Sequence, residues 1–220
     1  MALVTPAPHR HRHNETLHLP AYSFVRFSIR LRRTELHHCN GPYGVIACAI
    51  NSEVKRICII GTSGAGKTTL GKAVAQRLNL PFVDSDSFYW QAGWQPASQA
   101  VLQERVLAAT LGEAWVFEGN YLSLRQFVWQ RADTLIWLDF SLPVVLGRVC
   151  WRNTRRTIGR EQLWNGNRMN WRRAWSGVQH TRSTYQGKRA NYPQSIAEFP
   201  HLQVVHLRSP RQAKQWLLSV

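Results

Sequence analysis

From residue 54 to the end of the chain, short apolar runs alternate with amphipathic segments. The runs at 54–61, 80–84, 114–119, 133–140 and 202–207 have the length and the β-branched or aromatic content of strands. Apolar residues at a spacing of three or four predict helices at 67–78 and from after Ser98 through 111, and two more helices after 141 and 209. Strands that alternate with helices indicate an α/β fold with a parallel sheet covered on both faces.

The expected helix starts carry recognisable capping residues. Ser98, Ser141 and Ser209 each precede a predicted helix, and serine is a favoured N-cap residue. Pro143 and Pro210 fall in the first turn, where the missing N–H of proline costs nothing. These signals support the boundaries drawn from the hydrophobic pattern.

Composition narrows the class of protein. The chain has 220 residues, 44% of them apolar, and a net charge of +16. That charge favours polyanionic partners. Its apolar runs are strand-sized and none approaches the roughly 18 residues of a membrane span, and its four cysteines form no CxxC pair. We therefore expect a soluble, cytoplasmic protein without a membrane partner or a zinc site.

Residues 1–53 differ from the rest of the chain. They contain HRHRH at 9–13 and SIRLRR at 28–33, and their apolar patches have no sustained period. Transit peptides are rich in arginine and poor in acids, but Glu15 and Glu35 interrupt this segment. We favour a disordered extension, or a start assigned too early, over a targeting segment. The predicted domain spans 54–220.

The sequence GTSGAGKT at 61–68 fits the pattern G-x-x-x-x-G-K-[ST] between a predicted strand and a predicted helix. Glycines allow main-chain N–H groups to converge on an anion, and the helix N-terminus adds positive potential. In this pattern the lysine reaches the β- and γ-phosphates and the following hydroxyl ligates Mg²⁺. The residues predicted to bind the triphosphate of a nucleotide are Gly61, Thr62, Ser63, Gly64, Ala65, Gly66, Lys67, Thr68 and Thr69.

Carboxylates stand at the ends of three predicted strands. Asp84 and Asp86 follow the second strand, Glu118 closes the third, and Asp139 ends the fourth. Ligands of open α/β sheets bind outside the carboxyl ends of the strands. We predict that Asp86 orients or deprotonates an acceptor and that Glu118 holds Mg²⁺ through a water. The alternatives are a turn cap for Asp84 or Asp86 and a solvated charge for Glu118, and we interpret Asp139 as structural.

The segment 145–190 carries eleven lysine or arginine residues and one acid, Glu161, a net charge of +10. A solvated surface would carry balancing acids, so this excess indicates an anionic partner. Arginine binds phosphate with two parallel hydrogen bonds, and a well-placed arginine accelerates phosphoryl transfer. We predict an Arg-rich lid at about 152–175. Trp151, Trp164, Trp171 and Trp175 lie among the arginines and leave open a second use, the binding of single-stranded nucleic acid.

Six stretches occur in a fixed order: GTSGAGKTTL, DSFYWQAGW, FEGNY, ADTLIWLDF, RNTRRTIGREQLWNGNR and VVHLRSPRQAKQWL. In this order the chain resembles the adenylate-kinase-related P-loop proteins of bacteria, some of which are labelled topology modulation proteins. The resemblance covers about 54–218. Many families share the phosphate loop, whereas the patterns D-x-x-Y-W-x-x-G-W and R-E-x-L-W-N-G-N-R are far more specific.

The resemblance implies the nucleoside-monophosphate-kinase type of P-loop NTPase fold, with a five-stranded parallel sheet of order 2-3-1-4-5. It also implies ATP and Mg²⁺ as cofactors. It assigns contacts with the donor phosphates to Arg152, Arg156 and Arg160, and places Arg208 beside the adenine. FEGNY stands where true adenylate kinases carry Asp-Gly-Phe-Pro-Arg, which argues against AMP as the acceptor.

The predicted function is that of an ATP-dependent phosphotransferase, an adenylate-kinase-like P-loop kinase that moves the γ-phosphate to a small acceptor such as a nucleotide. The predicted catalytic residues are Lys67, Asp86, Arg152 and Arg156, and the predicted metal-binding residues are Thr68 and Glu118. The alternatives are a nucleic-acid-binding P-loop ATPase or regulator and, third, a nucleotide sensor. The acceptor and the oligomeric state stay open.

Overall fold

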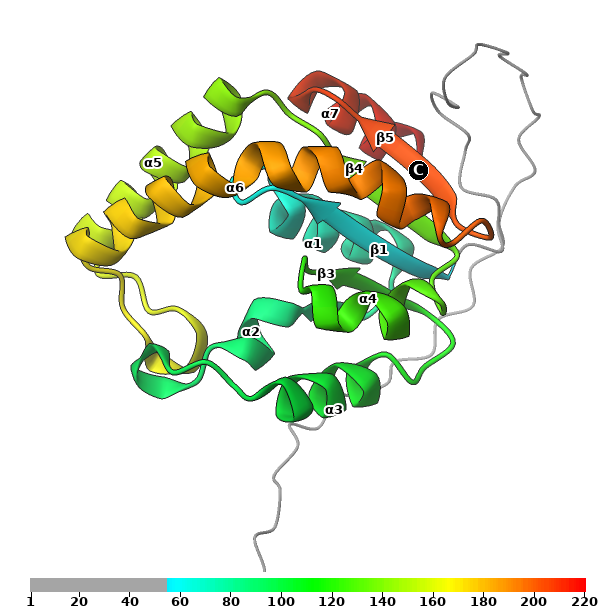
Figure 1. Ribbon diagram of the computed structural model, residues 1–220, viewed down its shortest axis with the longest axis horizontal. Coiled ribbons are helices and arrows are strands. Elements are labelled where there is room, and N and C mark those ends of the chain that lie inside the picture. The colour runs from blue at the N-terminus through cyan, green and yellow to red at the C-terminus, as the bar shows by residue number, and fades with distance from the viewer. Residues whose placement is uncertain (1–54) are drawn as a thin grey trace, which may run out of the picture. The chain divides into compact units, whose positions relative to one another are not determined.

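The computed structural model describes residues 55–220, so the predicted extension at 1–53 lies outside the described residues (Figure 1). Each of the five predicted strands contains an observed strand. The elements are β1 (Arg56–Gly61), α1 (Lys67–Leu78), β2 (Phe82–Asp84), α2 (Ser85–Tyr89), η1 (Ala92–Trp94), α3 (Gln99–Ala109), β3 (Trp115–Glu118), α4 (Leu122–Trp129), β4 (Thr134–Leu138), α5 (Leu142–Ile158), η2 (Trp164–Gly166), α6 (Trp171–Ala197), β5 (Gln203–Leu207) and α7 (Pro210–Ser219).

The strands form one parallel sheet of order β2-β3-β1-β4-β5, which confirms the predicted fold class and strand order. Its register aligns Asp84 with Glu118 on β3, and Glu118 in turn with Ile59 on β1. Because parallel strands end at a common edge, the loop after β1 and the acids after β2 and β3 gather there. This edge positions the site.

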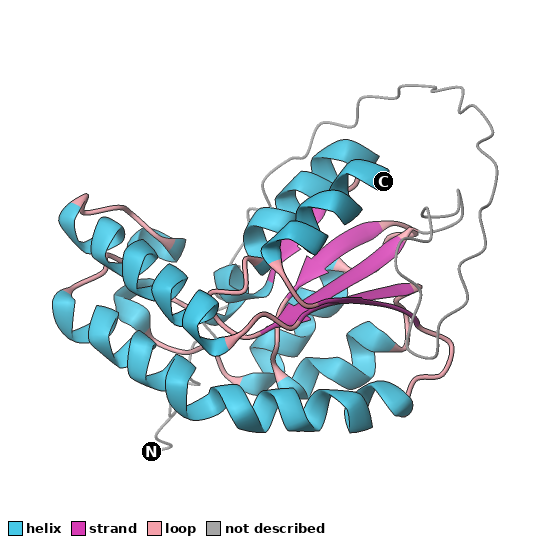
Figure 2. Cartoon of the chain, turned by 90° about the horizontal axis from the view of Figure 1, so that it is seen from above, coloured by secondary structure: helices cyan, strands magenta, loops and turns pink. Residues whose placement is uncertain are grey.

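Helices cover both faces of the sheet (Figure 2), and successive residues of each strand point to opposite faces. On β1, Cys58 and Ile60 pack in one apolar cluster with side chains from α3, α4 and α6. Ile57 and Ile59 pack in the other cluster with side chains from α1, α5 and α7. All four side chains have no exposed surface. This two-sided burial explains why the strands read as nearly continuous apolar runs.

The helix caps match the sequence at two of the three predicted serines. Ser98 accepts a hydrogen bond from the amide of Val101, and Ser209 accepts one from the amide of Gln212. Ser141 does occupy the N-cap of α5, but its side chain makes no capping hydrogen bond. The predicted N-cap position is therefore confirmed at Ser141.

The basic segment forms two packed helices, α5 and α6, joined by residues 159–170, which we name the lid loop (Figure 1). The hydrophobic pattern did not predict α6, although it has 27 residues. Its buried side chains are few, Ala174, Thr181, Tyr185 and Tyr192, so its sequence lacks a strong apolar stripe. Among the described residues, no helix has the length and apolar content needed to cross a membrane.

Candidate functional site

The loop between β1 and α1 has the backbone that the glycine pattern predicts. Gly64 and Gly66 have φ values of 85° and 96°, in the region that favours glycine, and Gly66 is the N-cap of α1. A Cβ at Gly64 would lie 2.4 Å from the carbonyl oxygen of Val145. The loop is therefore curled tightly against α5, with the N-terminus of a 12-residue helix behind it.

Lys67, Thr68 and Glu118 converge at the start of α1. The Lys67 ammonium lies 3.5 Å from one Glu118 oxygen, and the Thr68 hydroxyl donates to the other at 3.1 Å. Glu118 is only 4% exposed, so it is not a solvated charge. Burial raises the pKa of Glu118, while the Lys67 charge opposes that rise.

The same residues fit a magnesium ion. Mg²⁺ prefers oxygen ligands, keeps several waters and takes one or two protein carboxylates beside phosphate oxygens. Thr68 and Glu118 offer a hydroxyl and a carboxylate side by side. The described residues contain no group of three or more His, Cys, Asp or Glu side chains that could hold a metal by themselves.

Asn120 joins the end of β3 to the end of β1. Its side-chain oxygen accepts from the amide of Gly61 at 3.3 Å, and its side-chain nitrogen donates to the Gly61 carbonyl. It also lines the cleft described below. The FEGNY stretch stands out in the sequence, but the sequence assigns no role to its asparagine, because the partner is 59 residues away.

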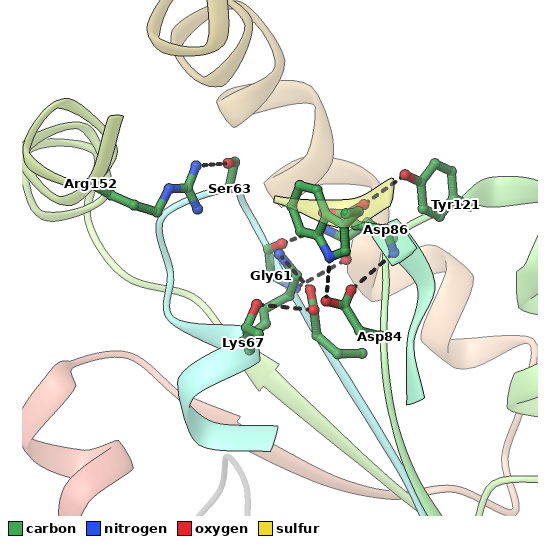
Figure 3. Close-up of polar contacts among 11 residues, drawn as sticks. Gly61, Ser63, Lys67, Asp84, Asp86, Tyr121 and Arg152 are labelled. Carbon is green, nitrogen blue, oxygen red and sulfur yellow. Dashed lines mark hydrogen bonds and ion pairs between the residues drawn. The ribbon is translucent and has the colours of Figure 1, made fainter. Parts of the chain in front are cut away.

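Asp84 and Asp86 lie close to Lys67, as Figure 3 shows, and Asp84 is in register with Glu118. Asp84 caps α2 by accepting from the amide of Asp86 at 3.0 Å, and its second oxygen accepts from the Trp164 indole at 2.9 Å. Burial raises the pKa of Asp84. One oxygen of Asp86 accepts from the Tyr121 hydroxyl at 2.7 Å. Asp84 thus has the capping role, and Asp86 is held with one oxygen still free of side-chain partners among the described residues.

Of the predicted lid arginines, Arg152 contacts the phosphate loop and Arg156 contacts the lid loop. Arg152 donates to the Ser63 hydroxyl at 3.4 Å, as Figure 3 shows, and its pKa is lowered by burial and by Arg156. Arg156 lies 3.8 Å from Glu161 and 5.8 Å from the centre of the Trp164 ring. Arg148, the first arginine of the basic segment, donates to the carbonyl of Ala65 at 3.2 Å.

Four residues named in the sequence analysis do not line the cleft described below. Arg160 and Arg208 are exposed and do not line the cleft, and Thr69 is also exposed. Asp139 pairs with Arg189 at 3.0 Å and with His206 at 3.1 Å, outside the cleft. The predicted donor contacts of Arg160 and Arg208 stay predictions.

A cleft of about 1090 Å³ runs from Ser63, Lys67 and Thr68 past the carboxylates to Trp94 and Trp164. This volume is at the upper limit of the range for single-ligand pockets, about 300–1,000 Å³. The cleft is therefore large for a site that binds one small ligand.

Helix α6 adds three basic side chains to the cleft, Arg173, His180 and Lys188, to which the sequence analysis gave no individual role. Their spacing of seven and eight residues places them on one helix face. Burial and the nearby Lys67 lower the pKa of Lys188, and burial also lowers the pKa of His180. These three residues recur at a helical period in the sequence, but the hydrophobic pattern did not predict the helix that carries them.

Fold and site together define a P-loop α/β protein whose phosphate loop opens into a two-part cleft. Comparisons agree with this class. The shikimate kinase family model matches residues 63–106. The uncharacterized protein YqaC of Bacillus subtilis is 28% identical over 52% of this chain and 65% of its own length. A shikimate kinase of Ruegeria pomeroyi is 31% identical over 46% of this chain and 60% of its own length.

The chain thus spans less than two thirds of the length of these relatives. Among solved structures, a shikimate kinase from Bacteroides thetaiotaomicron has a TM-score of 0.47 at 18% identity, over 75% of this chain and 95% of that one. A gluconokinase from Sinorhizobium meliloti has a TM-score of 0.46 at 18% identity, over 76% of this chain and 94% of that one. The similarity to P-loop small-molecule kinases is confirmed. The closer grouping with adenylate-kinase-related proteins stays a prediction.

Proposed function

We propose that this protein is a P-loop small-molecule kinase that transfers the γ-phosphate of ATP to an acceptor bound beside Asp86. One observation carries the proposal: Lys67, Thr68 and Glu118 line the same cleft as Asp86, and that cleft has a volume of about 1090 Å³. The family match at 63–106 supports the donor half of this proposal. The whole activity is proposed, because that match ends before Glu118 and the lid loop.

In the proposed reaction the phosphate loop and Lys67 hold the triphosphate, and Thr68 and Glu118 hold Mg²⁺. The metal would neutralise charge on the β- and γ-phosphates. Arg152 and Arg156 line the cleft and would balance the negative charge that spreads over the transferred group. Lys188, also in the cleft, adds a cation from α6.

Asp86 acts on the acceptor. Its free oxygen accepts the proton of the acceptor hydroxyl while that hydroxyl oxygen forms a bond to the γ-phosphorus. The bond from the γ-phosphorus to the bridging oxygen breaks, and ADP leaves. The aromatic side chains of Tyr89, Trp90 and Trp94 line this end of the cleft, which suits an acceptor with a ring, and the cations of α6 suit one with an anionic group.

The test incubates the full chain with γ-labelled ATP, Mg²⁺ and a panel of acceptors. The panel contains nucleoside monophosphates, nucleosides, hydroxylated acids including shikimate and gluconate, and polyols. We expect label in at least one acceptor and a loss of about 100-fold in Asp86→Asn. Lys214→Ala, an exposed change on α7, is the control and should keep full activity. Label that appears only in inorganic phosphate would contradict the proposal.

A second function, the binding of single-stranded nucleic acid, has one specific observation in its favour. Trp151, Trp171 and Trp175 are 71%, 61% and 63% exposed, and none of them lines the cleft. Exposed aromatic rings among arginines suit stacking on unpaired bases. A labelled oligonucleotide should then bind with a steep salt dependence, and Trp175→Ala should weaken that binding. If the fluorescence anisotropy of the labelled oligonucleotide does not change when the protein is added at low salt, nucleic-acid binding is ruled out.

A further inference from the structure

We propose that Trp164 is a positioning residue that couples docking of the lid loop to the orientation of Asp86. This inference rests on the proposed function, because it assigns Asp86 to the acceptor. It concerns a path of three hydrogen bonds between segments that lie far apart in the chain. The path runs from the lid loop through Asp84 to Asp86, and from Asp86 to Tyr121.

The lid loop is docked on residues 87–95, the segment that follows Asp86. The side-chain oxygen of Asn167 accepts from the amide of Trp94 at 2.7 Å, and its side-chain nitrogen donates to the carbonyl of Gln91 at 2.8 Å. Asn165 donates to the carbonyl of Ser87 at 3.3 Å. Two asparagines therefore bind the backbone of this segment, which fixes the lid loop over the acceptor end of the cleft.

Trp164 is the lid residue whose hydrogen bond reaches a carboxylate beside this segment. Its indole N–H donates to one oxygen of Asp84 at 2.9 Å, across 80 residues. The other oxygen of Asp84 accepts from the Asp86 amide at 3.0 Å. Because α2 has only five residues, too few to be stable without its cap, the geometry of Asp86 depends on how Asp84 is held.

Asp86 is fixed from a second side by Tyr121. The tyrosine hydroxyl donates to one oxygen of Asp86 at 2.7 Å, from a residue just before α4. The backbone of Asp86 is thus held through Asp84, and its carboxylate through Tyr121. Both restraints together aim the remaining oxygen, and loss of either one leaves Asp86 able to turn.

Loss of the indole donor has a direct electrostatic consequence. Hydrogen bonds to an ionised carboxylate are stronger than neutral ones, and burial already raises the pKa of Asp84. An undocked lid loop would leave that oxygen of Asp84 without its donor and would weaken the cap of α2. Asp86 would then be ordered only when the lid loop is docked. Docking of the lid loop and proton transfer to Asp86 would therefore be coupled.

Trp94 supplies a matched control for simple loss of lid docking. Its indole N–H donates to the carbonyl of Arg168 at 3.0 Å, across the same interface between the two loops. That bond touches neither aspartate. Trp94→Phe and Trp164→Phe therefore each remove one indole hydrogen bond from the interface, but only the second removes a donor from Asp84.

The kinetic arm is a double-mutant cycle on kcat with Trp164→Phe and Tyr121→Phe. We expect each single change to lower kcat about tenfold, with the KM for ATP unchanged, because both act through Asp86. The double variant should lose less than the product of the two effects, since a loosened base cannot be loosened twice. Trp94→Phe with Tyr121→Phe should be additive, and Trp164→His, which keeps a ring N–H, should recover part of kcat.

A second arm needs no turnover. Hydrogen exchange of the Asp86 amide in the full chain should rise about tenfold in Trp164→Phe and stay near the wild-type rate in Trp94→Phe. An Asp86 amide that does not respond to Trp164→Phe, or additive effects in the kinetic cycle, would overturn the proposal. If exchange responds but no acceptor is labelled, the coupling stands and the proposed kinase function fails, so the two outcomes are distinct.

Discussion

The two ends of the cleft are built in different ways. The phosphate end comes mainly from one continuous stretch, Gly61 to Thr68, with Glu118 added from β3. The acceptor end joins Asp86 to Tyr121, 35 residues away, and Asp84 to Trp164, 80 residues away. Binding of a polyphosphate needs main-chain amides at a helix start, which a local sequence can specify. Selection of an acceptor needs side chains that only the folded chain brings together.

The chemistry of the two ends differs as well. Lysine, threonine, serine and arginine line the phosphate end, whereas Tyr89, Trp90 and Trp94 make edge-to-face contacts at the acceptor end. Such contacts form rigid apolar walls. The phosphate end is therefore suited to a common donor, and the acceptor end to recognition of one particular shape.

The largest expected effect concerns the phosphate end. Lys67→Ala removes the cation beside Glu118 and should lower phosphotransfer by about 1000-fold, because a charged donor aimed at the transferred group is lost. Lys214→Ala, on the exposed face of α7, should leave the rate unchanged. Rates with γ-labelled ATP, together with a thermal melt of each variant, check this. Near-wild-type turnover in Lys67→Ala would remove the donor assignment.

The two faces of α5 offer a closer comparison. Arg152 lines the cleft and contacts Ser63, whereas the side chain of Arg155, three residues further on, is 68% exposed and does not line the cleft. We expect Arg152→Ala to lower kcat about 100-fold and Arg155→Ala to change it less than about twofold. Equal losses in the two variants would mean that the basic segment acts through its overall charge.

Glycines at the two ends should differ in their effect on stability. Alanine at Gly64 combines a φ of 85° with a Cβ only 2.4 Å from the Val145 carbonyl oxygen, whereas Gly93 has a φ of 69° and a Cβ there would meet no atom within 4 Å. Gly64→Ala should cost about 3 kcal/mol and Gly93→Ala about 1 kcal/mol of unfolding free energy. Urea unfolding measures both. The reverse order would show that the phosphate loop is not held against α5.

The smallest effect is a pH dependence at Glu118. Burial raises the pKa of Glu118 in the folded state, so ionisation of Glu118 lowers the free energy of unfolding. This loss of stability is absent at a pH below the pKa of the unfolded state and complete at a pH above the pKa of the folded state. Without Mg²⁺ or nucleotide, Glu118→Gln should match the wild type at about pH 4 and melt higher at about pH 7. Melting curves across this range decide it. A constant difference throughout would contradict the burial argument.

Sequence analysis predicted the elements whose structure is specified by residues close together in the chain. The five strands, α1 and the phosphate loop follow from apolar runs and a contiguous glycine motif, whereas the strand order came from the resemblance to P-loop kinases. Helix α6 escaped prediction because it buries little apolar surface, and with it Lys188 and His180. Trp164 shows the same limit. In the sequence it resembled Trp151 and Trp175, yet it binds Asp84 while they are exposed.

The central claim is that the loop after β1 binds the triphosphate of a nucleotide. Calorimetric titration of the full chain with Mg-ATP, and then with AMP, tests it most directly. We predict one site per chain, with ATP bound at a Kd between about 1 μM and 1 mM and AMP bound far more weakly. No heat with Mg-ATP, or equal affinity for ATP and AMP, would contradict the account.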